Sequence, residues 1–181
     1  MFFDTQSCTF VLVDVQEKLT PLVYDPEKLL NNCSILLDAA RILEIPVLWL
    51  EQYPRGLGHT VEVLAQRLNS SSQAVEKIAF SGCHEEACKN RLRDLGRDQC
   101  VVMGIEAHVC VYQTVIDLLA EGKQVQVVVN AVSSRDSANK SVALRRMEQE
   151  GARLTTVEMI LFELLRGSKH HCFKEIQGLI K

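Results

Sequence analysis

The feature that most constrains the fold is the alternation of short apolar runs with amphipathic segments of helical period. The first run, Thr9 to Val15, has almost no polar interruption, which is typical of a strand buried on both faces. The next segment, Pro26 to Leu43, has apolar residues spaced by three and four positions. Strands are predicted at 9–15, 46–50, 74–78, 99–103, 125–129 and 153–155. Helices are predicted at 26–43, 60–68, 84–95, 109–121, 139–150 and 156–165, with a terminal helix in 168–181.

This order predicts an α/β fold: one doubly wound, six-stranded parallel sheet inside a three-layer α/β/α sandwich. The length is that of one domain, and no linker, repeat or low-complexity segment interrupts it, so residues 1–181 are expected to form a single domain. Ligands of such sheets bind outside the carboxyl ends of the strands. We therefore expect functional polar side chains just after strands.

Three reactive side chains lie at or shortly after the carboxyl ends of three predicted strands: Asp14, Lys77 and Cys110. Each has an ordinary alternative, because Asp14 could be a turn or cap residue, Lys77 a solvated lysine, and Cys110 a buried thiol like the other six cysteines. Together they would face one crevice and supply a base, a counter-charge and a nucleophile. Because Cys110 lies at the start of a predicted helix, we expect its pKa to be lowered towards neutrality.

The motifs around these residues are similar to those of the isochorismatase-like cysteine hydrolase family over nearly the whole chain. The matching segments are Val13-Asp14-Val15-Gln16, Lys77-x-x-Phe80-Ser81, Gly104-Ile-Glu-x-x-Val-Cys110-Val-x-x-Thr114 and Asn130-Ala-Val-Ser-Ser-Arg135. The segments Glu51-Gln-Tyr-Pro54 and Gly56-Leu-Gly58 most resemble the eukaryotic isochorismatase domain-containing proteins and their bacterial relatives. A related group is labelled mitochondrial-associated ribonuclease.

The resemblance implies a catalytic triad of Asp14, Lys77 and Cys110 that hydrolyses a small amide or related carbonyl compound through a covalent, thioester-type intermediate. It implies a cis peptide bond between Ile105 and Glu106, which would direct the N–H groups of Glu106 and Cys110 into an oxyanion hole. The expected pocket residues are Gln16, Gln52, Tyr53, Phe80 and His108. The resemblance also implies a homo-oligomer, with the terminal helix and the Gln52-to-Leu57 loop as candidate contacts.

One segment departs from the family pattern. Nicotinamidase-type members carry a metal-binding Asp-x-His after the second strand, where this chain has Glu51-Gln-Tyr-Pro54 and the nearest histidine is His59. We therefore predict no catalytic zinc and no cofactor, and we do not expect nicotinamide as the substrate. The isochorismate-cleaving branch lacks this cysteine as a nucleophile, so the family name does not define the reaction.

A binding or scaffold protein that keeps the pocket without turnover is the second functional hypothesis.

The net charge and the distribution of apolar residues restrict the other functional classes. A net charge of −3 without a basic patch disfavours nucleic acid and a ribonuclease. No window approaches eighteen consecutive apolar residues and the first residues lack a targeting pattern, so we expect no membrane span and a cytoplasmic protein, with an organelle as the alternative.

Several other patterns have simpler interpretations. His108 lies two residues before Cys110, but side chains two apart at a helix start point in different directions, so a pocket-wall or interface role is favoured over a Cys–His dyad. His170-His-Cys172 offers few ligands, and we interpret it as a solvated tail or an oligomer contact. Arg135 is expected to form a salt bridge or start a helix, with a contact to a substrate carboxylate as the alternative. Cys83 and Cys88 are expected to be structural.

Overall fold

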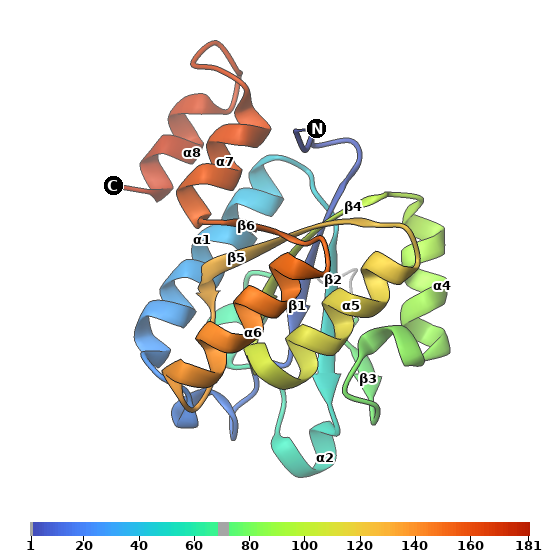
Figure 1. Ribbon diagram of the computed structural model, residues 1–181. Helices are drawn as coiled ribbons and strands as arrows, with labels where there is room; N and C mark the ends of the chain where they lie inside the picture. Colours follow the sequence, from blue (N-terminus) through green and yellow to red (C-terminus); the bar gives the residue numbers. More distant parts are fainter. Residues whose placement is uncertain (1, 69–72) are drawn as a thin grey trace.

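The sheet is wholly parallel. A computed structural model describes residues 2–68 and 73–181 (Figure 1). The six strands pair in the order β3-β2-β1-β4-β5-β6, so the predicted fold class is confirmed. They are β1 (Cys8–Val13), β2 (Val47–Gln52), β3 (Val75–Lys77), β4 (Gln99–Gly104), β5 (Gln124–Val132) and β6 (Arg153–Thr155).

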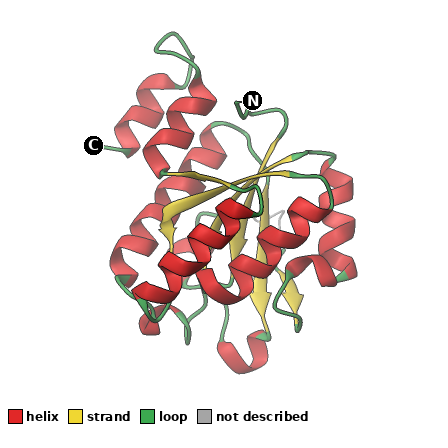
Figure 2. Cartoon of the chain, in the orientation of Figure 1, coloured by secondary structure: helices red, strands yellow, loops and turns green. Residues whose placement is uncertain are grey.

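Helices cover both faces of this sheet (Figure 2). One face carries α1 (Pro26–Ile42), α7 (Val157–Leu165) and α8 (Phe173–Leu179), and the other carries α4 (Glu86–Leu95), α5 (Tyr112–Ala120) and α6 (Ser137–Gln149). The apolar side chains form one cluster on each side of the sheet. The shorter elements are η1 (Thr20–Leu22), α2 (Pro54–Leu57), α3 (Glu62–Ala65), η2 (Gly82–His84) and a π-helical turn, η3 (Ala107–Val111).

The chain reverses its direction of travel across the sheet between β1 and β4. It runs from β1 outwards to β3 and then returns to place β4 beside β1. The carboxyl ends of β1 and β4 therefore flank the switch point at which ligands bind in such sheets. Asp14 directly follows β1, and Cys110 lies in η3 just after β4.

Gly104 permits the close approach of these two strand ends. It pairs with Val13 and has a φ of +122°. A Cβ atom at this position would lie 2.1 Å from the carbonyl oxygen of Val13. Glycine is thus required here for both space and backbone conformation.

Three predicted segments differ from the structure. The predicted helix at 60–68 shrinks to α3, because Thr60 forms a β-bridge with Gln16 and donates its N–H to Glu51 Oε1 at 2.6 Å, which holds its backbone extended. The predicted loop after the second strand contains α2. The helix predicted from Val109 begins two residues earlier as η3.

The terminal helix packs within the chain. Ile176 is fully buried, and Phe173, Leu179 and Ile180 are partly buried against the cluster that includes α1. This packing leaves little of the apolar face for the oligomer contact that was predicted there. Within the described part of the chain, no helix has the length and hydropathy needed to cross a membrane.

Candidate active site

A buried ion pair joins the ends of two strands that are not neighbours. Lys77 is the last residue of β3, and its Nζ lies 2.7 Å from Oδ2 of Asp14, with both side chains inaccessible to solvent. Lys77 Nζ also donates to Gln52 Oε1 at 2.6 Å and to the Phe80 carbonyl at 3.0 Å. The ammonium group is therefore held in place from three directions.

Asp14 has unused capacity to accept a proton. It adopts a left-handed conformation with φ of +50° immediately after β1. Its carboxylate forms the ion pair with Lys77, and the Cys110 thiol and the backbone N–H of Gln52 also interact with it. Burial raises the pKa of Asp14, and the charge of Lys77 opposes this rise. The carboxylate is thus a stronger base than an ordinary aspartate.

Cys110 lies beside this pair in η3, with 7% of the residue exposed. Its Sγ is 4.0 Å from Gln52 Oε1. Burial, reinforced by the charge of Asp14 and opposed by that of Lys77, raises the pKa of Cys110 to about 12. The prediction of a lowered pKa is therefore wrong, because desolvation of the thiolate outweighs the favourable helix start. The site thus holds a protonated thiol with the Asp14 carboxylate next to it.

Burial does not distinguish Cys110 from the other cysteines. All seven are buried free thiols, and burial also raises the pKa of Cys33 and Cys100 to about 12. The distinguishing feature is the neighbourhood, since Asp14 and Lys77 interact with the Cys110 thiol. Cys83 and Cys88 lie in the apolar cluster of the α4–α5 face, consistent with a structural role.

Gln52 is central to the site, and sequence reasoning gave it only a place on the pocket wall. It ends β2, directly opposite Lys77 in the register of the sheet. Its Oε1 lies near both Lys77 Nζ and Cys110 Sγ, and its Nε2 donates to the Ile78 carbonyl at 2.7 Å. Two fixed contacts thus orient the amide.

Gln16 lies behind the site rather than in the pocket. It is fully buried, its Oε1 accepts the Gln52 N–H at 2.7 Å, and its Nε2 donates to the carbonyls of Gln52 and Gly58 at 2.9 and 2.6 Å. The prediction of a pocket residue is corrected to that of a positioning residue. No sequence signal distinguished these roles, because they depend on which way a buried amide points.

The predicted oxyanion-hole segment has an available donor. The peptide bond between Ile105 and Glu106 is cis. The N–H of Glu106 has no hydrogen-bond partner among residues 2–68 and 73–181. The Glu106 carboxylate accepts from the N–H and Nε of Arg135 at 2.9 and 3.1 Å, which confirms the expected salt bridge of Arg135. A free N–H four residues before the thiol of Cys110 is the kind of donor that an oxyanion hole uses.

The remaining predicted pocket residues divide into two groups. Tyr53 and Phe80 are half-exposed, and Tyr53 lines a cavity of about 250 Å³ that also touches Lys77 and Ile78. His108 Nδ1 instead lies 3.0 Å from Ser134 Oγ, so the imidazole is paired away from the thiol. A larger hollow of about 730 Å³ lies at the amino ends of the strands, beside Pro46 and Arg97, far from these groups.

A family model for the isochorismatase domain matches residues 8–159. The chain belongs to the isochorismatase family. It is 40% identical over 178 residues to isochorismatase domain-containing protein 2 of Danio rerio, covering 97% of this chain and 88% of the relative. These matches confirm the family that the motifs indicated.

Two solved structures share the fold of this isochorismatase-family chain. The MAR1 ribonuclease of Caenorhabditis elegans is 40% identical, with a TM-score of 0.95 over 99% of this chain and 92% of that one. The Escherichia coli YcaC gene product, described as an octameric hydrolase of unknown specificity, is 24% identical, with a TM-score of 0.89 over 99% and 95% of the two chains. The family and fold indicate a hydrolase, while the names of these relatives point to different activities.

Proposed function

We propose that this chain is a cysteine hydrolase that cleaves a small amide or related carbonyl substrate. The observation that carries the proposal is the buried Asp14–Lys77 ion pair beside the Cys110 thiol. A nucleophile, a base and a fixed counter-charge are the groups that acyl transfer needs. Their place at the switch point of the sheet also supports a ligand site.

In the first half of the reaction, Cys110 Sγ bonds to the substrate carbonyl carbon while its proton passes to Asp14. The developing oxyanion accepts hydrogen bonds from the N–H groups of Glu106 and Cys110. The tetrahedral intermediate then expels the amine, which takes the proton from Asp14. The product of this step is a thioester on Cys110.

In the second half, water attacks the thioester carbon and gives its proton to Asp14. The carbon–sulfur bond breaks, the acid leaves, and the proton returns to Cys110 to restore the thiol. Lys77 remains protonated and compensates the carboxylate charge whenever Asp14 is ionised. Each proton has a place on Asp14, the thiol or the leaving group, so the mechanism requires no metal or cofactor.

The relation between the two pKa values supports proton transfer during attack. The pKa of Cys110 is raised to about 12, so a free thiolate is rare at neutral pH. The pKa of Asp14 is also raised, which reduces the energy gap for moving the proton from sulfur to carboxylate. The thiol therefore ionises as it attacks rather than beforehand.

The test is a screen of small amides and ureas with mass spectrometry of the intact protein. We expect a product whose formation requires Cys110, and a transient acyl adduct that is absent from Cys110→Ala. Cys33→Ala is the matched control, since Cys33 is a buried cysteine of α1 on the opposite side of the sheet. Substrates that bind without an adduct or product would instead support the binding or scaffold hypothesis.

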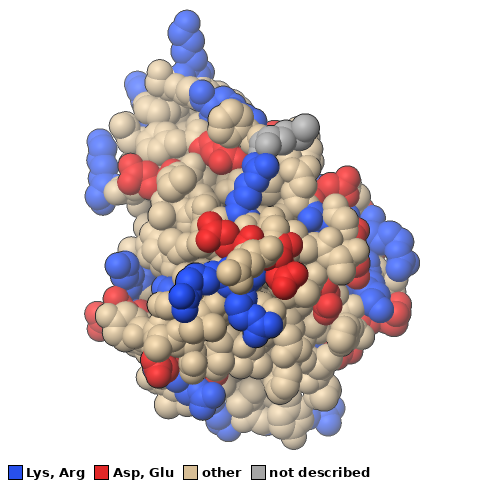
Figure 3. All heavy atoms as spheres, in the orientation of Figure 1, with Lys and Arg blue, Asp and Glu red and all other residues tan. Residues whose placement is uncertain are grey.

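A ribonuclease activity is a second candidate because the MAR1 relative carries that description. The net charge of −3 argues against it, and acidic and basic side chains are interspersed on the face drawn in Figure 3. RNA cleavage by the purified protein that disappears in both Cys110→Ala and Asp14→Ala would reverse this preference. Cleavage that survives both changes would point to a contaminant.

We also propose a cytoplasmic homo-oligomer, in keeping with the octameric E. coli neighbour. The exposed contact candidates are on the segment from Gln52 to Leu57, where Tyr53 is 50% exposed, and on the adjoining Ile78, which is 71% exposed. Light scattering coupled to size-exclusion chromatography would measure the molar mass of the assembly directly. A change of Ile78 to Glu should reduce that mass, whereas a monomeric wild-type protein would refute the proposal.

A further inference from the structure

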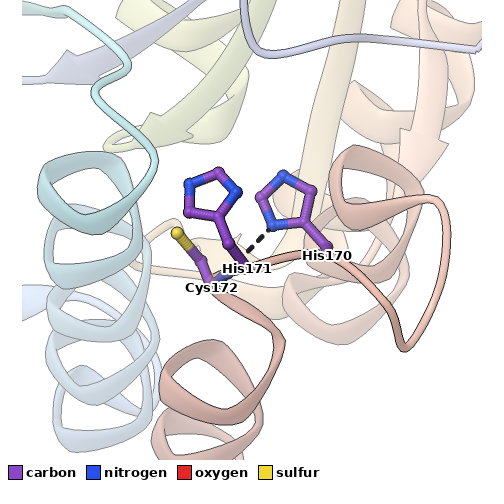
Figure 4. Close-up of side chains that lie close together, drawn as sticks. All are labelled: His170, His171 and Cys172. Carbon is purple, nitrogen blue, oxygen red and sulfur yellow. Dashed lines mark hydrogen bonds between the residues drawn. The ribbon is translucent and has the colours of Figure 1, made fainter.

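A second group of reactive side chains lies between α7 and α8, at His170, His171 and Cys172 (Figure 4). Each side chain offers one atom that can bind a metal, and these atoms lie within 4.8 Å of one another. In Figure 1, α7 and α8 stand at the end of the molecule opposite α2. The group is therefore separate from the site of Cys110.

Cys172 is fixed rather than part of a solvated tail. Only 5% of the residue is exposed, and its Sγ donates to the carbonyl oxygen of Ile42 at 3.6 Å. Ile42 is the last residue of α1. The carbonyls at a helix C-terminus carry partial negative charge, which favours a cation nearby. The interpretation of this segment as a solvated tail is thus wrong for its cysteine.

The imidazole rings of His170 and His171 are stacked, and among the residues that the structure describes only that of His170 is held by a hydrogen bond. Their ring centroids are 4.4 Å apart and their planes differ by 23°. His170 Nδ1 accepts the N–H of Cys172 at 3.1 Å, so this nitrogen holds a lone pair in the neutral ring. His171 is exposed, and its ring can rotate towards the sulfur at little cost.

We propose that His170, His171 and Cys172 bind one zinc-like divalent cation. Imidazole nitrogen and thiolate sulfur are the ligands that zinc prefers, and three protein ligands leave a fourth position for water. Bond lengths of about 2.0–2.3 Å place the atoms of tetrahedral ligands roughly 3.3–3.8 Å apart. The ligand atoms here lie within 4.8 Å of one another, and a rotation of the His171 side chain is sufficient to bring them to that spacing.

Binding of the cation would displace the proton of the Cys172 thiol and the hydrogen bond between His170 and the Cys172 N–H. The Cys172 thiol releases its proton to solvent as sulfur bonds to the metal. His170 gives up its hydrogen bond with the Cys172 N–H and uses the same lone pair for the metal. Once deprotonated, the Cys172 sulfur no longer donates to the Ile42 carbonyl, and the cation bound beside it instead faces the partial negative charge at the C-terminal end of α1. A ligand that binds only the folded state raises thermal stability.

The experiment titrates cobalt(II), as a visible substitute for zinc, into chelator-treated protein. We expect one equivalent to bind with a thiolate-to-cobalt charge-transfer band that disappears in Cys172→Ser. His170→Ala and His171→Ala should each weaken binding by about tenfold or more. His84→Ala is the matched control, because His84 is an exposed histidine of η2 and should leave the affinity unchanged.

A second arm separates this site from Cys110. Cys110→Ser should keep the cobalt band, and loss of the band in that variant would overturn the proposal by placing the metal at the active site. Because Cys172→Ser could disturb α8, the exposed His171→Ala decides the matter when its circular dichroism matches the wild type. Unchanged affinity in that variant, or no retained equivalent in the wild type, would also overturn the proposal.

Discussion

The side-chain oxygen of Gln52 accepts a hydrogen bond from Lys77 Nζ at 2.6 Å, inside a site where Lys77 is 1% exposed. Gln52 thus occupies one of the three donor positions of the ammonium group and directs the others to Asp14 and Phe80. A buried donor that loses its acceptor costs about 1–3 kcal/mol.

Gln52→Leu removes that acceptor while keeping a similar volume. We expect the free energy of unfolding to fall by about 1–3 kcal/mol and turnover to fall because Lys77 is no longer held in place. Denaturant unfolding and the kcat of the best amide substrate measure the two effects. Gln52→Glu is the informative counterpart, since a second carboxylate next to Lys77 should preserve stability better than leucine does.

Lys77→Met leaves Asp14 buried without its counter-charge. Breaking one partner of a buried pair costs about 3–5 kcal/mol, and we expect activity to be lost because Asp14 becomes protonated. The double variant Asp14→Asn with Lys77→Met should recover much of the stability but none of the activity. A double variant that is less stable than Lys77→Met would show that the pair contributes little to the fold.

The pH dependence of alkylation reports the state of Cys110. With its pKa raised to about 12, the rate of modification by iodoacetamide should rise continuously between pH 7 and pH 10, without a plateau near neutrality. Cys110→Ala identifies the signal from this thiol. A plateau with a midpoint near pH 7 would contradict the assignment of a protonated resting thiol.

Asp14 should make the folded state less stable as the pH rises. Its pKa is raised on folding from the ordinary value of 3.8, so between these two values the folded protein binds more protons than the unfolded chain. Its contribution to stability is therefore present at low pH and is lost as the pH rises through the raised pKa. The free energy of unfolding of the wild type and of Asp14→Asn should be measured at several pH values. As the pH rises above 4, the wild type should lose stability relative to the variant.

Gly104→Ala should be among the most destabilising single changes. The new Cβ would meet the Val13 carbonyl at 2.1 Å, and the φ of +122° is unfavourable for alanine. We expect a loss of roughly 3 kcal/mol or more. Gly96→Ala is the control, since Gly96 also has a positive φ but has no atom within 4 Å of the added carbon, and it should lose only about 1–2 kcal/mol.

The sequence was sufficient to predict the sheet and the meeting of Asp14, Lys77 and Cys110, because strand ends of a parallel sheet share one edge. It was insufficient for Gln52 and Gln16, whose roles depend on the register of β2 with β3 and on a bridge to Thr60. The direction of the Cys110 pKa shift could not be predicted either, because the sequence indicates the helix start but not how deeply the thiol is buried.

The order of the strands has a consequence for how the protein is made. Asp14, Lys77 and Cys110 come from three separate strand–helix units, and β4 enters the sheet beside β1 only after two outward strands have been laid down. A nascent chain emerging from the ribosome therefore exposes the partners of Cys110 well before the cysteine itself is synthesised. Parallel crossovers of this kind fold slowly, because the chain loses conformational entropy in bringing distant segments together before stabilising contacts form. Until β4 is in place, the Asp14–Lys77 pair is not yet covered by the strand that carries Cys110 to it.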